Sequence, residues 1–380
     1  MRASSAMLPI LPLLVGYVAA QKVVGTAMGF AEGATGGGDA APAIPADIEE
    51  LKLWLGDDEP RVIVLDKEYN FIGSEGKVTE MGCRPPNNKC PGNGGQDAIN
   101  GANWCADKPE IEVTYDKAGI KGIDVASHKT ILGIGSEGVL RGKGLRMVKG
   151  VENVIIQNIH ITELNPQYIW GGDAIQTFGA AKIWVDHVKI SLIGRQMFAA
   201  SSGGSTGGSV TISNSEFDGL TSWSSRCNNK HYWTILLNGE QDSITLFGNY
   251  IHDTAGRSPK VAGKATVLHA VNNLFEEVDE GFDVTAPSEV LAEGNTLDRV
   301  EEPILEDKKT GKLYTQDGAA CDPIFGRDCL ANTVSDSGSF ESKDQVFDAF
   351  KGCPAVEPDN SINPRVTAGV GKLGCGGGGY

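Results

Sequence analysis

Short apolar runs repeat through the middle of the chain, and most of them end in Asn or His. The polar residues that follow these runs are Asn158, His187, Asn214, Asn249, Asn273 and Asn295. They lie 22 to 35 residues apart, which is too irregular for propeller blades but natural for a coil of stacked strands with loops of variable length. The pattern predicts an all-β fold, a single-stranded right-handed parallel β-helix. Stacked rungs would bring the polar markers about 4.8 Å apart, where side-chain amides bond one another.

The flanking regions show other patterns. Residues 45–55 predict an N-terminal capping helix, with Asp47 near its start and Gly56 as its stop. Residues 61–65 predict a strand, and residues 82–108 a Cys-, Gly- and Asn-rich loop held by disulfides. From about residue 307 the chain has few strand patterns, so we expect it to wrap the coil and to end in a flexible tail over residues 376–380.

The first 20 residues resemble a secretory signal peptide, with Arg2 before an apolar stretch and small residues at its end. The apolar stretch is too short to span a bilayer, so we expect no membrane segment in the mature domain, residues 21–380. Eight cysteines fit disulfides in an oxidising compartment, and their spacing does not predict a metal site. A net charge of −16 argues against nucleic-acid binding. The chain is therefore expected to be secreted and extracellular.

Positive side chains recur at one offset from the markers. Arg195 follows His187 by eight residues and Arg257 follows Asn249 by eight, which predicts equivalent strand ends about 10 Å apart, two rungs along the coil. Lys260 lies beside Arg257, and Asp173 follows two glycines that let the backbone approach a ligand. Three cations and a carboxylate on one face make a candidate site for stabilising negative charge.

Five segments in order resemble the pectin lyases of the pectate and pectin lyase family. They span much of the chain, and each alone is weak evidence, whereas their order on a β-helix pattern is specific. They are residues 29–38 (GFAEGATGGG), 170–175 (WGGDAI), 184–187 (WVDH), 193–196 (IGRQ) and 256–260 (GRSPK).

The resemblance implies cleavage of methyl-esterified polygalacturonan by β-elimination. Arg257 matches the residue that removes the C5 proton, and Asp173, Arg195 and Lys260 match the supporting residues. In the calcium-dependent members an acidic calcium ligand takes the place of Arg195, so the guanidinium replaces the metal's charge and no cofactor is expected. The base role is unusual, because a guanidinium in water keeps its proton. Crowding by Arg195 and Lys260 would lower the pKa of Arg257.

Aromatic rings and cysteines complete the picture. Sugar faces stack on aromatic rings, so rings that flank the motifs predict substrate contacts: Trp104, Trp170, Tyr232 and Trp233. The resemblance implies the disulfides Cys83–Cys105, Cys90–Cys227 and Cys321–Cys329, which leaves Cys353 and Cys375 as a possible pair. The expected partner is methyl-esterified pectin, and a capped coil has no need to associate, so a monomer is expected.

Two other functions compete with a pectin lyase. A calcium-dependent pectate lyase would have the same fold, but Arg195 argues against it. A non-catalytic β-helix protein that binds carbohydrate would share the pattern without the chemistry. Absorbance near 235 nm, from the unsaturated product, separates the three when substrate esterification, calcium and chelator are varied.

Overall fold

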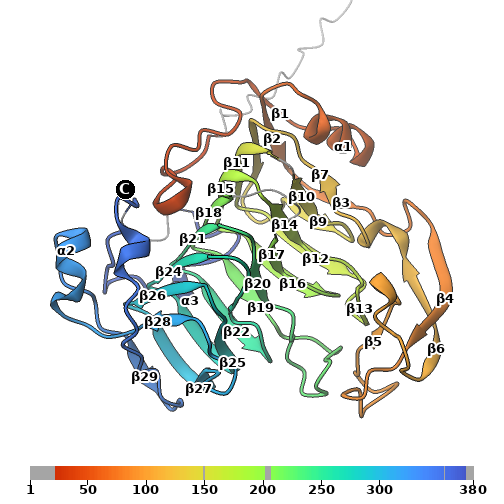
Figure 1. Ribbon diagram of the computed structural model, residues 1–380. Coiled ribbons are helices and arrows are strands. Elements are labelled where there is room, and N and C mark those ends of the chain that lie inside the picture. Colours follow the sequence, from red (N-terminus) through yellow and green to blue (C-terminus); the bar gives the residue numbers. More distant parts are fainter. Residues whose placement is uncertain (1–21, 149, 202–206, 355, 374–380) are drawn as a thin grey trace, which may run out of the picture.

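The computed structural model describes residues 22–148, 150–201, 207–354 and 356–373. Parallel strands stack into two long sheets that the chain visits in turn on each rung, which confirms the predicted parallel β-helix (Figure 1). A third, four-stranded sheet projects from one side. No helix in the described ranges is long and apolar enough to cross a membrane. The predicted signal peptide lies outside the described residues.

Sheet 1 contains ten parallel strands, and all six of the predicted apolar runs belong to it. Its strands, in spatial order, are β1 (Pro42–Ala43), β2 (Arg61–Leu65), β8 (Lys129–Gly133), β11 (Glu152–Gln157), β15 (Ala181–Asp186), β18 (Ser209–Ser213), β21 (Ser243–Phe247), β24 (Val267–Val271), β26 (Glu289–Glu293) and β28 (Lys312–Tyr314).

Sheet 2 is bent into two arms. The first arm contains β3 (Glu68–Asn70), β9 (Val139–Arg141), β12 (His160–Leu164), β16 (Lys189–Ile193), β19 (Glu216–Asp218), β22 (Tyr250–Thr254), β27 (Thr296–Ile304) and β29 (Thr333–Ser335). The second arm contains β7 (Ile123–Asp124), β10 (Leu145–Val148), β14 (Ile175–Phe178), β17 (Phe198–Ser201), β20 (Ile235–Asn238) and β23 (Lys260–Val261). The long strand β25 (Leu274–Val284) pairs with both arms.

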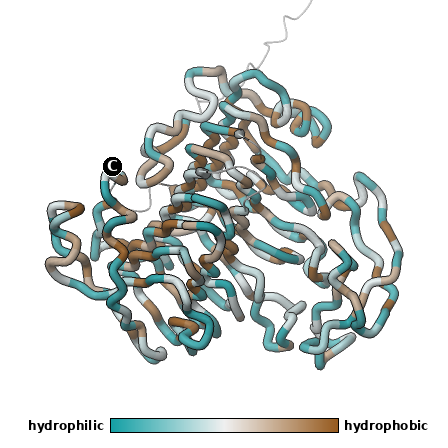
Figure 2. The backbone as a smooth tube through the Cα atoms, in the orientation of Figure 1, coloured by the Kyte–Doolittle hydropathy of each residue, from teal (hydrophilic) through white to brown (hydrophobic). Residues whose placement is uncertain are grey.

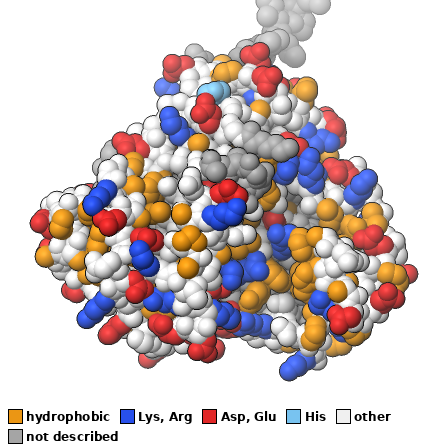
Figure 3. All heavy atoms as spheres, viewed as in Figure 1, with side chains coloured by type: hydrophobic (Ala, Val, Ile, Leu, Met, Phe, Trp, Pro, Cys, Tyr) orange, Lys and Arg blue, Asp and Glu red, His pale blue; other side chains and the backbone are white. Residues whose placement is uncertain are grey.

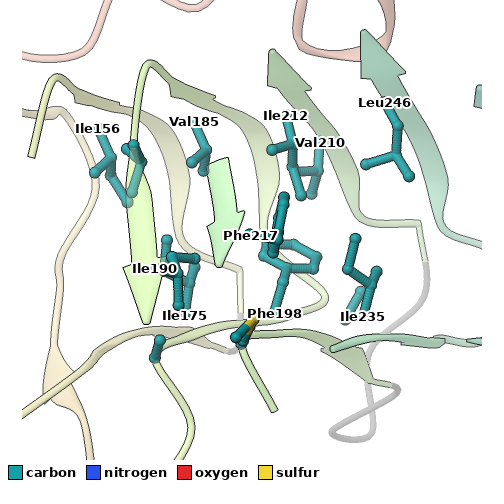
Figure 4. Close-up of a cluster of buried hydrophobic side chains, with 14 of the residues drawn as sticks. Ile156, Ile175, Val185, Ile190, Phe198, Val210, Ile212, Phe217, Ile235 and Leu246 are labelled. Atoms are coloured by element: carbon teal, nitrogen blue, oxygen red, sulfur yellow. The ribbon is translucent and has the colours of Figure 1, made fainter. Parts of the chain in front are cut away.

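The coil is filled by aliphatic and aromatic side chains that stack rung upon rung. In sheet 1 the register places Ile156, Val185, Ile212 and Leu246 in one row, and Phe217 and Phe198 face them from the two arms of sheet 2 (Figure 4). All six side chains are at most 1% exposed. Hydrophobic segments accordingly run through the inside of the coil (Figure 2). Burial of this row on successive strands fixes the register, since a one-residue slip would turn apolar side chains outward.

The predicted polar stack exists over part of the coil. Asn249 Nδ2 donates to Asn273 Oδ1 at 2.9 Å, Asn273 donates to Asn295 at 2.9 Å, and Asn295 donates to Asn332 at 3.0 Å. The prediction was wrong for Asn158, His187 and Asn214. The register Asp186–Ser213–Phe247 aligns these residues with Gly248, one position before the ladder. They adopt positive φ values of 59°, 51° and 45°, a conformation for which Asn is suited.

One α-helix closes the N-terminal end of the coil. Helix α1 (Ile48–Gly56) begins after Asp47, whose carboxylate accepts hydrogen bonds from the backbone of Glu49 and Glu50. It therefore starts three residues later than predicted, because Asp47 is the N-cap and Pro45 lies outside. Leu51 and Leu55 are fully buried against the coil. Residues 29–38, including the short 3₁₀ helix η1 (Gly29–Ala31), cross sheet 1. There a Cβ on Gly29 would lie 2.4 Å from Thr245 Oγ1.

The C-terminal segment does more than wrap the coil. Strands β28 and β29 extend sheet 1 and sheet 2, so the segment supplies part of the last rung, which its sequence did not predict. Beyond them lie η4 (Ala319–Cys321), α2 (Asp322–Phe325), η5 (Phe347–Phe350) and α3 (Pro364–Thr367). The bond Cys321–Cys329 is confirmed, with a Cα–Cα distance of 5.0 Å. Cys375 and the predicted tail lie outside the described residues.

The four-stranded lateral sheet is held by the cysteines. It contains β4 (Lys77–Cys83), β5 (Asp97–Ala98), β6 (Glu110–Asp116) and β13 (Tyr168–Ile169), and the short helices η2 (Gly101–Asn103) and η3 (Lys117–Gly119) flank β6 in the sequence. The predicted disulfides Cys83–Cys105 and Cys90–Cys227 are both confirmed. The second joins this lobe to the loop between β19 and β20, across 137 residues of sequence.

Candidate active site

The candidate residues lie where the chain passes from the first to the second arm of sheet 2, on successive rungs. Asp173 precedes β14, Arg195 lies between β16 and β17, Tyr232 and Trp233 precede β20, and Arg257 lies between β22 and β23. Stacking of the rungs thus brings together residues up to 84 positions apart in sequence. Lys and Arg side chains gather in the hollow between the coil and the lateral lobe (Figure 3).

Asp173 and Arg195 form the first charged pair. Arg195 Nε lies 3.4 Å from Asp173 Oδ1, and the guanidinium stacks on Trp170, 4.1 Å from the ring centroid. The carboxylate also accepts hydrogen bonds from the Gln196 backbone at 2.9 Å and from Gln176 Nε2 at 2.7 Å. The aspartate side chain is only 3% exposed, whereas that of Arg195 is 24% exposed. Arg195 is therefore fixed while part of its charge faces the hollow.

Lys260 forms the second pair, with a partner that sequence reasoning missed. Lys260 Nζ lies 2.6 Å from Asp283 Oδ2, and β23 and β25 place the two residues directly opposite each other. Asp283 follows Asn273 by ten residues and Lys260 follows Asn249 by eleven. Applying the offset of Lys260 from Asn249 to the next marker, Asn273, would have predicted a site residue one position after Asp283.

Arg257 differs from the other two cations. Within the described ranges no carboxylate forms an ion pair with it, and its Nε has no hydrogen-bond partner. Its guanidinium lies 4.5 Å from the Trp233 ring centroid and 5.9 Å from that of Tyr232. Burial lowers the pKa of Arg257, and the positive charge of Arg195 lowers it further, against opposing contributions from Tyr232 and Asp283. The site thus disfavours the charged form of one arginine.

The two arginines are neighbours, but not through an equal offset. The register pairs Lys189 with Glu216 and Glu216 with Tyr250. Arg195 is the sixth residue after Lys189, and Arg257 is the seventh after Tyr250, so Gln196 is the residue equivalent to Arg257. The equal-offset prediction was wrong by one position, because it used Asn249 where Gly248 is the residue that aligns with His187. The prediction that the arginines lie two rungs apart is confirmed.

Three of the four predicted aromatic residues contact arginines. The Arg195 guanidinium stacks on Trp170, and the Arg257 guanidinium stacks on Trp233. Trp233 also packs edge-on against Tyr232. Trp104 lies in the lateral lobe, where Lys108 Nζ is 4.2 Å from its ring centroid. Trp104, Trp170 and Trp233 border one apolar cluster built on Cys83 and Cys105. Sugar stacking on these rings stays a prediction; the structure shows that three of the four rings orient guanidinium groups.

Charged residues outside the predicted set also line this corner. Arg226 pairs with Glu280 and lies 4.8 Å from the Tyr232 ring centroid, and Lys230 lies 2.9 Å from Asp279. Arg226 and Lys230 precede β20 in a long loop with no rung pattern, and Asp279 and Glu280 lie inside β25. No sequence signal distinguished them from ordinary surface charges.

The fold and the site define a parallel β-helix protein in which cations and aromatic rings gather at one corner. The family described as pectate lyase matches residues 99–346. The chain is 50% identical to "Probable pectin lyase F" of Aspergillus niger, over 95% of this chain and 78% of the relative. It is 43% identical to "Probable pectin lyase B" of Aspergillus fumigatus, over 97% of this chain and 99% of the relative. The chain therefore belongs to the family of pectate and pectin lyases.

Solved structures support the fold independently. A pectate lyase from Paenibacillus sp. 0602 superposes with a TM-score of 0.58 over 92% of this chain and 96% of its own, at 16% identity. A mutant of Bacillus subtilis pectate lyase also has a TM-score of 0.58, over 93% of this chain and 99% of its own, at 16% identity. At this identity the likeness extends to the fold alone.

Proposed function

We propose that this protein is a pectin lyase that cleaves methyl-esterified (1→4)-α-galacturonan by β-elimination. The C5–H bond breaks, and the proton passes to a guanidine nitrogen of Arg257. The electron pair first forms an enolate-like state on the ester and then a C4–C5 double bond, as the bond from C4 to the glycosidic oxygen breaks. The departing oxygen takes a proton from solvent. The products are a 4,5-unsaturated end and a new hydroxyl end.

The state of Arg257 is the observation that carries this proposal. A guanidinium in water does not act as a base, because its pKa is above about 12. Arg257 is partly buried, stacked on Trp233 and repelled by Arg195, and each of burial and repulsion lowers its pKa. Bound substrate would remove further water and strengthen both effects. The arrangement makes loss of the Arg257 proton easier than it is in water.

Arg195 and Lys260 have the complementary role of stabilising negative charge as it develops on the ester. Each is held by an aspartate, Arg195 by Asp173 and Lys260 by Asp283, so neither cation must reorganise when the proton leaves. Preorganised charges of this kind contribute strongly to catalysis in a water-poor site. Both cations keep part of their surface open, with side-chain exposures of 24% and 28%.

The charge of the groove favours an ester over a free uronate that needs a metal. A uronate already carries a negative charge, so removal of its C5 proton requires a further cation, whereas an ester is neutral. The carboxylates in the corner are engaged by arginine or lysine. In the part of the chain that the structure describes, the one group of residues with metal-like spacing is Glu216, Asp218 and His252, on the first arm, and Lys189 bonds both of its acids. We propose that the reaction needs no metal.

Absorbance near 235 nm tests the proposal directly. The purified protein is incubated with highly methylated pectin and with de-esterified polygalacturonate, each with chelator and with calcium. We expect an increase with methylated pectin that chelator does not reduce. An increase confined to polygalacturonate with calcium would establish a pectate lyase instead. No increase with either substrate across the pH range would favour a binding protein without catalytic activity.

Location and assembly are proposed on separate grounds. The three disulfides fit an oxidising compartment, so we propose that the protein is secreted and that residues 1–20 are removed. Residues 21–380 would then form one lyase domain that acts as a monomer. The mature N-terminus and the solution mass test both statements.

A further inference from the structure

Two buried side chains link the parts of the site that carry the arginines. Gln96, before β5 in the lateral lobe, is 1% exposed, and His231, before β20, is 3% exposed. Neither belongs to a motif that identified the family, and neither is placed to contact substrate. Polar side chains this deeply buried need hydrogen-bond partners, and the identity of those partners is informative.

Gln96 and His231 bond the same two segments. Gln96 Nε2 donates to the Gly194 carbonyl at 2.8 Å, and Gln96 Oε1 accepts from Trp233 Nε1 at 3.2 Å. His231 Nε2 lies 2.8 Å from the Arg195 carbonyl oxygen and 3.2 Å from that of Trp233. The neighbouring carbonyls of Gly194 and Arg195 are thus each held by one side chain. Trp233 is held at its ring by Gln96 and at its backbone by His231.

These two segments support the two guanidinium groups. Arg195 extends from the first segment to stack on Trp170, and Arg257 stacks on the ring of Trp233. Like charges in a poorly solvated site repel each other, so without restraint the segments would relax apart. We propose that Gln96 and His231 are positioning residues that form a clamp, and that this clamp sets the distance between Arg195 and Arg257. The inference rests on the proposed function.

The backbone of His231 extends the clamp to the next rung. Its carbonyl accepts a hydrogen bond from Ala255 at 2.8 Å, two residues before Arg257. Burial lowers the pKa of His231 to about 4, so its ring is neutral at higher pH. Since both neighbours of Nε2 are carbonyl oxygens, Nε2 carries the proton and donates. A neutral donor holds the segments without adding a third positive charge beside the arginines.

The clamp has a specific kinetic consequence. The charged and titratable groups that act on the pKa of Arg257 are Tyr232, Arg195 and Asp283. Arg195 is on the first clamped segment, Tyr232 adjoins Trp233 on the second, and Asp283 is on neither. If Arg195 moves away, its repulsion weakens and the pKa of Arg257 rises. The rate depends on neutral Arg257, so the acidic limb of the pH–rate profile would move to higher pH. A merely structural residue would not produce this shift.

The test measures kcat, KM and the pH–rate profile of Gln96→Met and His231→Leu on methylated pectin. Loss of positioning by about 1 Å costs up to about 100-fold in rate, so we expect kcat to fall about 10- to 100-fold with KM nearly unchanged. We expect the acidic limb to move upward. His231→Gln keeps a donor near Nε2, and we expect it to recover most of the rate and the original profile.

His160→Leu is the matched control. His160 is a partly buried histidine whose pKa is lowered to about 4, and its Nε2 lies 2.9 Å from Ser191 Oγ, on the first arm of sheet 2. We expect His160→Leu to lower stability without moving the profile. If His231→Leu does not fold, the kcat and pH–rate profile of Gln96→Met test the inference. Folded clamp variants with the wild-type profile would overturn the inference, whereas an inactive wild-type protein would refute the proposed function.

Discussion

Two polar corners of the coil satisfy their buried polar groups to different degrees. Between sheet 1 and the first arm, Asn249, Asn273 and Asn295 bond one another and the neighbouring backbone. Between the two arms, several buried atoms have no hydrogen-bond partner within the described ranges. They are Trp170 Nε1, both amide atoms of Gln196, Arg257 Nε and Asp283 Oδ1.

This difference in hydrogen bonding indicates different roles for the two corners. A buried polar group without a partner destabilises the folded protein by about 1–3 kcal/mol, so a purely structural corner would not retain several of them. A corner that binds a polar polymer gains when the ligand supplies the missing partners. The asparagine corner therefore supports the stacking of the rungs. The arginine corner leaves buried polar atoms whose partners would have to come from a ligand or from water.

The largest expected effect is at the arginine corner. Arg257→Lys keeps a positive side chain but loses the planar group stacked on Trp233, and lysine is more strongly hydrated. We expect kcat/KM on methylated pectin to fall about 10²- to 10⁴-fold, the range of a general base, with little change in thermal stability. The assay follows absorbance near 235 nm.

Arg299→Lys is the matched control for that substitution. Arg299 is 43% exposed and pairs with Glu276, Glu277 and Asp298 on the outside of the coil. We expect its activity to equal that of the wild type. Full activity of Arg257→Lys would contradict any need for the guanidinium.

A buried charge with complete partners should show the opposite behaviour. Glu293 is fully buried and is bound by His269 at 2.8 Å, by both terminal nitrogens of Arg327 at 2.8 Å, and by the Leu330 backbone at 3.0 Å. Glu293→Gln removes the buried counter-charge of Arg327 and leaves it only the exposed Glu357, so we expect unfolding free energy to fall by about 3 kcal/mol. Activity per folded molecule should not change. Denaturant unfolding and the 235 nm assay measure the two quantities.

Glu293 also gives a pH dependence with a definite sign. Burial alone would raise its pKa, but the hydrogen bonds from Arg327 and His269 outweigh burial and lower the pKa from 4.5 to about 2. A lowered folded-state pKa means that this stabilisation is complete above about pH 4.5 and is lost as the pH falls toward 2. We expect the thermal midpoint to fall across this window, and to fall less steeply in Glu293→Gln. Parallel curves for the two proteins would show that Glu293 stays charged throughout.

The asparagine ladder can be disrupted by a substitution that does not contact the candidate active site. Asn273→Leu removes bonds to Asn249, Asn295 and the Leu246 carbonyl. We expect unfolding free energy to fall by about 2 kcal/mol, because several neighbouring polar atoms lose their partners. Asn93→Leu, at an exposed loop position, serves as the control and should change stability little. A larger loss of activity than of stability in Asn273→Leu would mean that the two corners are coupled.

The smallest effect concerns Trp170. Trp170→Phe keeps a ring beneath the Arg195 guanidinium but removes the unpartnered Nε1 donor. We expect KM for methylated pectin to rise about 3- to 10-fold, the cost of about one hydrogen bond, with kcat nearly unchanged. Steady-state kinetics measures both. An unchanged KM would show that the indole donor does not meet substrate.

The order of the rungs was readable in the sequence because burial acts on each strand separately. Every predicted apolar run became a strand of sheet 1, since an inward row of Val, Ile and Leu has only one register that keeps it dry. The markers were less reliable. Asn serves both at the positive-φ turn, as in Asn214, and in the ladder one residue later, as in Asn249, so spacing alone could not distinguish the two positions.

The sequence predicted only those site residues that lie within recognisable motifs. Asp173, Arg195, Arg257 and Lys260 were found together with the resemblance, whereas Asp283, Gln96 and His231 have no local signal. Asp283 lies inside a long strand, and Gln96 comes from a loop that a disulfide links to the distant Cys227. Such residues act through partners on other rungs.

The sequence by itself determined the coil and its apolar interior, because these follow from residue type and spacing along the chain, and its motifs indicated three cations at one corner. Only the tertiary structure decided which cation has a carboxylate partner and which has none among the described residues. Asp173 and Asp283 pair with Arg195 and Lys260, and burial with the repulsion of Arg195 lowers the pKa of Arg257. Burial and charge repulsion depend on distances through space, which the order of residues does not specify.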